Sequence, residues 1–142
     1  MNKTATAINI WSGSKQMKGL GAALTNPTEL SFKKGNIKNH YPINFRGVQF
    51  VDAEAAYQQF KTGNLEEDKK LMTQIIVVKL IKYPQLFEKI QDNGGVAWLE
   101  KCAHLVVHNQ HWEGVGHQSN FICCLIDAYL LIAKNIVINR DH

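Results

Sequence analysis

Polar side chains of four kinds share the segment FVDAEAAYQQFK, residues 50–61. Asp52 is a good helix N-cap, because its carboxylate accepts a hydrogen bond from the open N–H groups of a first helical turn. Glu54 then falls in that first turn. Three polar residues follow it on the same helix face: Tyr57, Gln58 and Lys61. This stripe of an acid, a phenol, an amide and an amine is either a site for acid–base or charge-stabilising chemistry or a solvated helix face.

A second polar segment, HNQHWEGVGHQSN (108–120), precedes an apolar run. Loops held by a rigid scaffold often carry function. Trp112 can stack on a ring, Asn109 and Glu113 can form hydrogen bonds, and the glycines allow a backbone to approach a ligand closely. The alternative is a structural connection in which Trp112 fills the core.

The histidines near this loop raise the question of a metal site. His104, His108 and His111 have a spacing that would suit one helix face. No C-x-x-C or H-E-x-x-H pattern is present, however, and the valines at 106 and 107 favour a strand. We therefore expect no metal and no cofactor, and structural or substrate-contacting histidines. Likewise, GLGAAL (19–24) is only a fragment of a nucleotide-binding glycine pattern.

The elements that must position these residues are mostly helical. Leu71, Ile75 and related apolar positions predict a long helix after the TGN break at 62–64. Pro84 suits the start of the next helix, and NGG (93–95) predicts a turn. The segment 29–51 alternates and contains glycines, as short strands and loops do. We predict a mainly α single domain over 1–142, with a small β element near 29–51 and helices at 52–62, 65–81, 84–91, 96–103 and 120–134.

The composition limits the classes of protein. The chain has 142 residues, a net charge of +4 and three cysteines, with a pI near 9.0. A mildly basic protein can bind an anion such as a nucleotide or nucleic acid. Cys123 and Cys124 are adjacent in an apolar run, which indicates inert packing thiols and a reducing, cytoplasmic setting. That run, 121–133, is too short to cross a bilayer and contains Asp127, and the N-terminus has no signal-peptide pattern.

Five motifs occur in an order that resembles the NADAR (YbiA-like) family. They are LTNP (24–27), the 50–61 segment, KL (79–80), WLE (98–100) and HWEGVGHQSN (111–120) before an apolar helix. The resemblance covers most of the chain. It implies a mainly helical single domain and cleavage of N-glycosidic bonds, either in phosphorylated riboflavin-pathway intermediates or in ADP-ribosylated guanine.

The resemblance also assigns residues. Glu54 matches the family's catalytic glutamate and Lys61 the lysine seven residues later. Three more positions match family positions: Asn26, Trp112 and Asn120. The chain departs from the family at Asn109, where an aspartate is common, at Glu113, where glycine is usual, and in lacking a tryptophan between the Glu/Lys helix and the next lysine-bearing helix.

N-glycoside cleavage develops positive charge on the sugar, which a carboxylate can stabilise. A first-turn position favours ionised Glu54, through the helix dipole and the open N–H groups. Lys61 and Arg46 are candidates for holding a phosphate. The candidates for a general acid are Lys61, Tyr57 and His117.

We therefore expect an N-glycosidase, with a small nucleotide or an ADP-ribosylated base as substrate and nucleic acid as one carrier of that base. The main alternative is a catalytically weak module that binds ADP-ribose or NAD-like nucleotides, which Asn109 would favour. A third class is a nucleic-acid-binding protein, indicated by the basic pI. No membrane partner is expected, and the sequence leaves the oligomeric state open.

Overall fold

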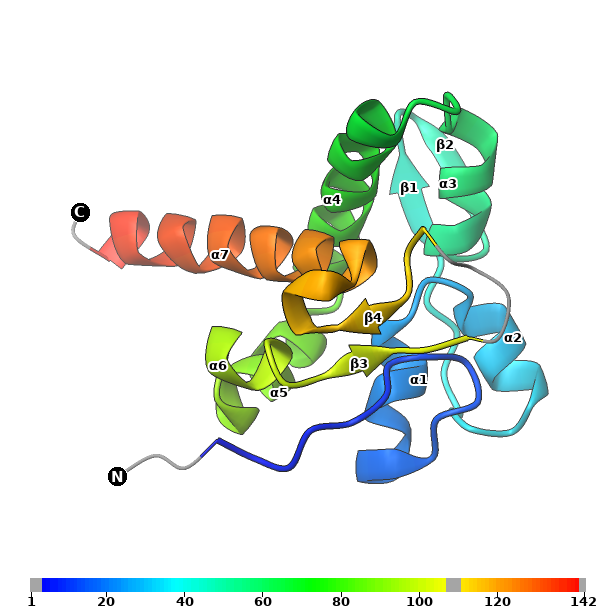
Figure 1. Cartoon of the computed structure of the whole chain (residues 1–142). Helices are drawn as coiled ribbons and strands as arrows, with labels where there is room; N and C mark the ends of the chain where they lie inside the picture. Colours follow the sequence, from blue (N-terminus) through cyan, green and yellow to red (C-terminus); the bar gives the residue numbers. More distant parts are fainter. Residues whose placement is uncertain (1–3, 107–110, 141–142) are drawn as a thin grey trace.

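Helices α4 (Leu65–Lys82) and α7 (Asn120–Arg140) pack against each other at the centre of the computed structural model, which describes residues 4–106 and 111–140. Each has an apolar face with fully buried residues, such as Ile75 of α4 and Leu125 of α7. Asn64 caps α4 through a hydrogen bond from the Glu67 amide. In Figure 1, the C-terminal part of α7 projects to the left of the other helices.

In Figure 1 the shorter helices lie to the right of this pair and below it. Their bounds are α1 Leu20–Leu24, α2 Thr28–Lys33, α3 Ala53–Phe60, α5 Pro84–Asn93 and α6 Val96–Leu99. Two 3-10 turns, η1 (Gln16–Gly19) and η2 (Gly116–Gln118), precede α1 and α7. Pro84 starts α5, where its missing N–H costs no helical hydrogen bond. One continuous apolar core lies beneath these elements.

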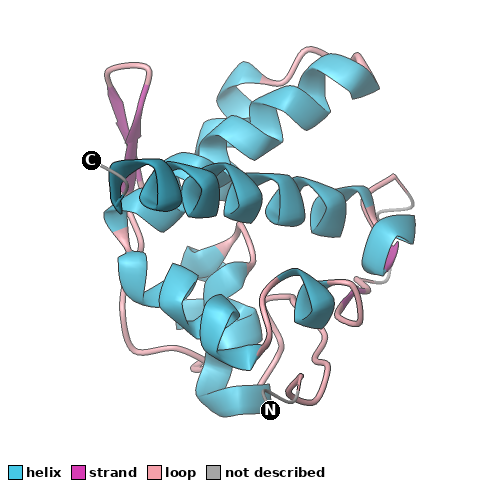
Figure 2. Cartoon of the chain, turned by 90° about the vertical axis from the view of Figure 1, so that its left-hand side faces the viewer, coloured by secondary structure: helices cyan, strands magenta, loops and turns pink. Residues whose placement is uncertain are grey.

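The described strands are short and form two antiparallel pairs, drawn in magenta in Figure 2. β1 (Ile43–Phe45) pairs with β2 (Val48–Phe50) in the register Ile43↔Phe50. The two residues that join these strands, Arg46 and Gly47, both have positive φ. That geometry matches the twist of a two-residue hairpin. β3 (Ala103–His104) pairs with β4 (Gly114–Val115).

The predicted mainly helical class is confirmed, and so is a small β element within 29–51. Two details differ. Residues 28–33 form α2 rather than strand or loop, with Glu29 in the first turn. The helix predicted over 96–103 ends at Leu99, because the chain then turns and pairs with β4. That pairing joins residues ten and twelve positions apart, and local sequence patterns do not encode it. No helix in the described part of the chain is long and apolar enough to cross a membrane.

Candidate active site

Helix α3 directs three of the predicted polar residues into one cavity of about 240 Å³, called here the inner cavity. The residues are Glu54, Tyr57 and Gln58. Asp52 begins the helix as predicted, because its Oδ1 accepts a hydrogen bond from the Ala55 amide at 2.9 Å. The N-cap therefore sets the rotation of α3, and the helical spacing brings these three side chains to the same side.

Asn26 reaches the inner cavity from the connection between α1 and α2. Its backbone oxygen accepts a hydrogen bond from the Glu54 amide at 3.2 Å, which ties this connection to the first turn of α3. Its side-chain Nδ2 contacts the sulfur of Met72. Asn26 is 3% exposed, and its Oδ1 has no hydrogen-bond partner among the described residues. A buried amide oxygen without a donor is costly, so a ligand that donates a hydrogen bond there is favoured.

Trp112 forms another wall of the inner cavity. Its ring is buried and meets the Tyr57 ring edge-on, with the ring centroids 5.7 Å apart. The backbone oxygen of Trp112 accepts a hydrogen bond of 2.6 Å from the buried Ser119 hydroxyl. Ser119 Oγ also accepts from the Ile122 amide, so it joins this loop to the start of α7. Trp112 thus fills the core and lines the cavity at once, which combines the two alternatives drawn from the sequence.

The ionisation of Glu54 differs from the expectation. Burial raises the pKa of this carboxyl, and it outweighs the lowering effects of Gln58 and Lys61. Gln58 Nε2 donates a hydrogen bond of 2.7 Å to Glu54 Oε2. The helix N-terminus favours the charged form, but folding also removes water from around the side chain, and this desolvation disfavours the charged form. Glu54 is therefore a stronger base when ionised than an exposed glutamate.

Several residues that were not assigned to the site from the sequence also line the inner cavity, among them His104 and Phe121. The His104 ring lies 4.6 Å from the Phe121 ring, centroid to centroid. Its Nδ1 lies 2.7 Å from the Ile10 oxygen, so Nδ1 carries the proton and donates it. Burial lowers the pKa of His104, which favours the neutral ring with Nε2 as an acceptor. The valines at 106 and 107 indicated a strand in this segment, but nothing local indicated a cavity.

Lys61 and Arg46 do not line the inner cavity. α3 ends at Phe60, so Lys61 is the C-cap and leaves the helical stripe that was predicted to include it. It lines a neighbouring open pocket of about 520 Å³, called here the outer pocket. Tyr57 and Trp112 belong to both hollows and separate them. Arg46 lies in the β1–β2 turn, with its guanidinium 4.8 Å from the Phe60 ring centroid.

The other predicted residues support the loop or lie away from the cavity. His117 Nε2 lies 2.7 Å from a carboxylate oxygen of Glu100. Glu113 accepts a hydrogen bond from the Val106 amide, and Asn120 donates one to the His111 oxygen. His117, Glu113 and Asn120 are not among the described residues that line the inner cavity. Asn109 lies outside the described residues.

A buried lysine holds the Asn26 connection in place. Lys79 of α4 is 1% exposed. Its Nζ donates hydrogen bonds of 2.6 Å to the backbone oxygens of Ala23 and Thr25, at the end of α1. Burial lowers the pKa of Lys79 to about 7, although Asp52 partly opposes this. The sequence motif KL contained this residue but did not indicate that it is buried.

No family model, no curated protein and no solved structure matches this chain. Within residues 4–106 and 111–140, no three His, Cys, Asp or Glu side chains gather as metal ligands.

Proposed function

We propose that this protein is an N-glycosidase that cleaves an N-ribosyl bond in a nucleotide-like compound or an ADP-ribosylated guanine base. One observation carries the proposal: the Glu54 carboxyl lines the same cavity as the Asn26 amide oxygen, which has no hydrogen-bond partner within residues 4–106 and 111–140. A carboxylate beside an anomeric carbon stabilises oxocarbenium-like charge. The Asn26 oxygen would accept a hydrogen bond from a sugar hydroxyl. The order of motifs that resembles the NADAR family supports the same reaction.

The sizes of the two hollows suggest how a nucleotide would be divided between them. The inner cavity, at about 240 Å³, is smaller than the usual ligand pocket of about 300–1,000 Å³. It would hold the ribose and the reacting bond, and the rest of the substrate would extend outward. The outer pocket contains Lys61 and His111, which can contact a phosphate. Asp68 also lines it, but its oxygens accept hydrogen bonds from Thr62 and Gly63.

The proposed reaction needs one proton donor and one proton acceptor. As the bond between the anomeric carbon and the base nitrogen breaks, both electrons leave with the nitrogen, which takes a proton. Tyr57 is the only one of the three predicted general acids that lines the described inner cavity. Burial raises the pKa of its phenol, so the proton is retained at neutral pH. Water then adds to the anomeric carbon and gives a proton to Glu54, and solvent restores both groups.

A hydrolysis assay read by mass spectrometry tests the proposal. The substrates are ADP-ribosylated guanine in DNA or RNA, free NAD, ADP-ribose and phosphoribosyl-amine intermediates. We expect the wild-type protein to release a base from at least one of them. Glu54→Gln should lower the rate by about 100- to 10,000-fold, the usual effect of losing such a group. Glu67→Gln, which removes an exposed glutamate of α4, should leave the rate unchanged.

Two results would contradict the glycosidase. Equal rates for the wild-type protein and Glu54→Gln would show that this carboxyl takes no part in the reaction. No release from any substrate would contradict catalysis itself. A thermal shift with ADP-ribose in that second case would instead identify the binding module expected as the alternative.

A further inference from the structure

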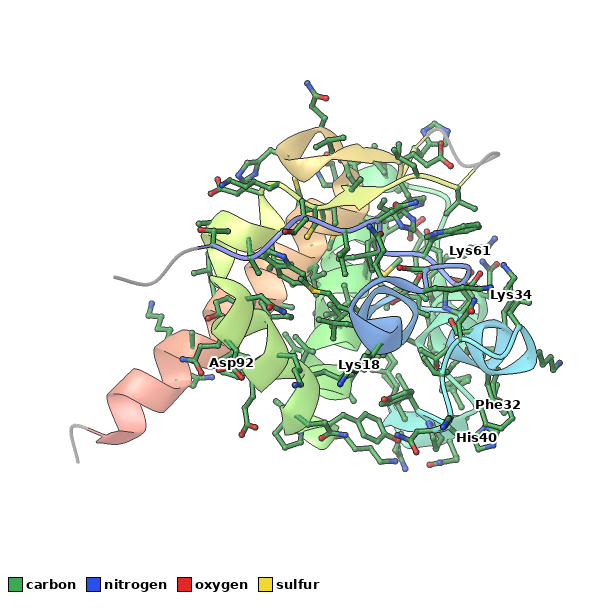
Figure 3. The ribbon with its side chains drawn as sticks, turned by 90° about the horizontal axis from the view of Figure 1, so that it is seen from below. Lys18, Phe32, Lys34, His40, Lys61 and Asp92 are labelled. Carbon is green, nitrogen blue, oxygen red and sulfur yellow. The ribbon has the colours of Figure 1, made fainter. Side chains whose placement is uncertain are left out.

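A groove on another part of the surface, called here the basic groove, has a volume of about 730 Å³. Its walls come from η1 and α1, from the chain after α2, and from α5. Three exposed lysines line it, Lys18, Lys38 and Lys89. Figure 3 looks onto this face from below, with Lys18 near the middle of the view. The lining of the groove, within the described residues, includes no Asp or Glu.

The groove exists because two distant segments meet at a glycine. Met17, Lys18 and Gly19 all have left-handed backbone conformations, with φ of 51°, 57° and 88°. A Cβ on Gly19 would lie 2.3 Å from the backbone oxygen of Asn36. Only glycine allows this contact, which packs the η1 turn against the loop 34–38. The contact brings Lys18 and Lys38 to one groove, although they are far apart in the sequence.

The uncompensated charge distinguishes this groove from another lysine-bearing groove. The hollow between α4 and α7 also has three lysines, Lys69, Lys70 and Lys134, but Glu66 and Asp127 line it as well. In the basic groove, the other polar lining residues are uncharged, among them Asn39, Gln85 and Asn93. Glu88 and Asp92 are close to Lys89 in the sequence, but neither is among the described residues that line the basic groove. The charge in the basic groove is therefore +3.

We propose that the basic groove binds the phosphodiester backbone of a single-stranded nucleic acid. Lysine ammonium groups neutralise successive phosphates, and this releases counterions from the strand. The neutral amides can bond phosphate or sugar oxygens without adding negative charge. A positively charged concave groove follows one strand, as in proteins that bind single strands without sequence preference. A duplex presents a convex surface and does not enter such a groove.

The basic groove and the inner cavity share one supporting loop. Lys34 Nζ donates a hydrogen bond of 2.7 Å to Ser12 Oγ, and Asn36 Nδ2 donates one of 2.9 Å to the Ser12 oxygen. Ser12 lines the inner cavity, and Asn36 lines the groove. The binding of a single strand in the basic groove does not depend on the proposed reaction. If the strand also carries the ADP-ribosylated base, that part of the inference rests on the proposed function.

Fluorescence anisotropy with a labelled single-stranded oligonucleotide of about 12 nucleotides tests the proposal. Three phosphate contacts predict a slope of about −2 for log K against log salt. Affinity should therefore fall about 15-fold between roughly 50 and 200 mM salt. The triple variant Lys18→Gln, Lys38→Gln, Lys89→Gln should lose most of this slope and bind at least about tenfold more weakly at low salt.

A matched control separates the groove from total charge. Lys69→Gln, Lys70→Gln, Lys134→Gln removes the same charge from the α4–α7 hollow and should change the affinity less than about twofold. Equal losses in the two triple variants would overturn the proposal, as would the absence of binding by the wild-type protein. A duplex of the same length binding as tightly as the single strand would also overturn it.

A second measurement uses only the wild-type protein, so it stands even if a triple variant does not fold. Amide resonances in an NMR titration with the same oligonucleotide should shift at residues 17–20, 35–39 and 89–93. Shifts confined to other surfaces would contradict the assignment. Because neither assay measures hydrolysis, a failure here is distinct from a failure of the proposed N-glycosidase.

Discussion

At the scale of single residues, Glu54 shows how two local effects oppose each other. Its place in the first turn of α3 favours the ionised form through the helix dipole. Burial beside the inner cavity disfavours that form and has the larger effect, so the pKa of the carboxyl is raised. Gln58 partly restores ionisation by donating a hydrogen bond to Oε2. The basicity of the proposed catalytic group is therefore set partly by a neighbour one helical turn away.

We predict that Gln58→Leu raises the pKa of Glu54 further. The substitution removes a hydrogen bond that stabilises the carboxylate and adds apolar surface beside it. The measurement is an NMR titration of the Glu54 side-chain carboxyl carbon in the wild-type and variant proteins, which needs no substrate.

Gln59→Leu serves as the matched control for this titration. It makes the same change at an exposed position of the same helix, and the Glu54 titration should then follow that of the wild-type protein. An unchanged or lower pKa in Gln58→Leu would show that this hydrogen bond does not form in solution.

At the scale of elements, Lys79 connects α4 to the end of α1. Its two hydrogen bonds hold the Ala23 and Thr25 carbonyls, and Asn26 follows directly. The uncharged amine still carries two hydrogens, enough for both bonds. The connection can therefore remain in place whether or not this lysine is protonated.

We predict that Lys79 makes the protein more stable as the pH rises from about 7 toward 10.5. Burial lowers the pKa of Lys79 from 10.5 to about 7. In this window the unfolded chain binds the proton and the folded protein has lost it, so the free energy of unfolding increases with pH. The increase from this one group is at most about 1.4 kcal/mol per pH unit. Below pH 7 both states are protonated and the contribution is constant.

The measurement is urea unfolding of the wild-type protein and Lys79→Met at several pH values. The free energy of unfolding of the wild-type protein minus that of Lys79→Met should increase with pH between about 7 and 10.5. The tyrosines and cysteines are the same in both proteins, so their contributions cancel in this difference. Lys70→Met removes an exposed lysine of the same helix and should give a difference that is constant with pH. A constant difference for Lys79→Met would contradict the prediction.

At the scale of the whole molecule, Trp112 and Tyr57 separate the inner cavity from the outer pocket. Tyr57 comes from α3 and Trp112 from the segment before α7, so the partition depends on how distant elements pack. The Ser119 hydroxyl fixes the Trp112 backbone to the start of α7.

We predict that Trp112→Ala lowers the free energy of unfolding by about 3–5 kcal/mol, the usual range for removing a buried tryptophan. Trp112→Phe should cost less, because a smaller ring keeps an edge contact with Tyr57. Chemical denaturation of both variants measures the two losses.

Trp11→Ala is the control, because Trp11 is only partly buried and its removal should cost less than that of Trp112. A cost for Trp112→Ala below that of Trp11→Ala would show that the 111–119 segment does not pack against α3 in solution.

The sequence by itself determined the features that one element specifies. Asp52 as N-cap, the helices after Asn64 and at Pro84, and the shared face of Glu54, Tyr57 and Gln58 all follow from local backbone geometry. The mainly helical class follows from the same periodic patterns. The prediction for Lys61 was wrong even within this one helix. α3 ends at Phe60, so Lys61 does not share the face of Glu54, Tyr57 and Gln58.

Only the tertiary structure decided which elements meet. It brought Asn26, His104 and Trp112 to α3, buried Lys79, and placed Lys18 beside Lys38. Contacts between distant segments depend on how whole apolar faces pack, and no spacing within one helix or loop encodes them. The desolvation that raises the pKa of Glu54 has the same origin, because other elements exclude water from around its side chain.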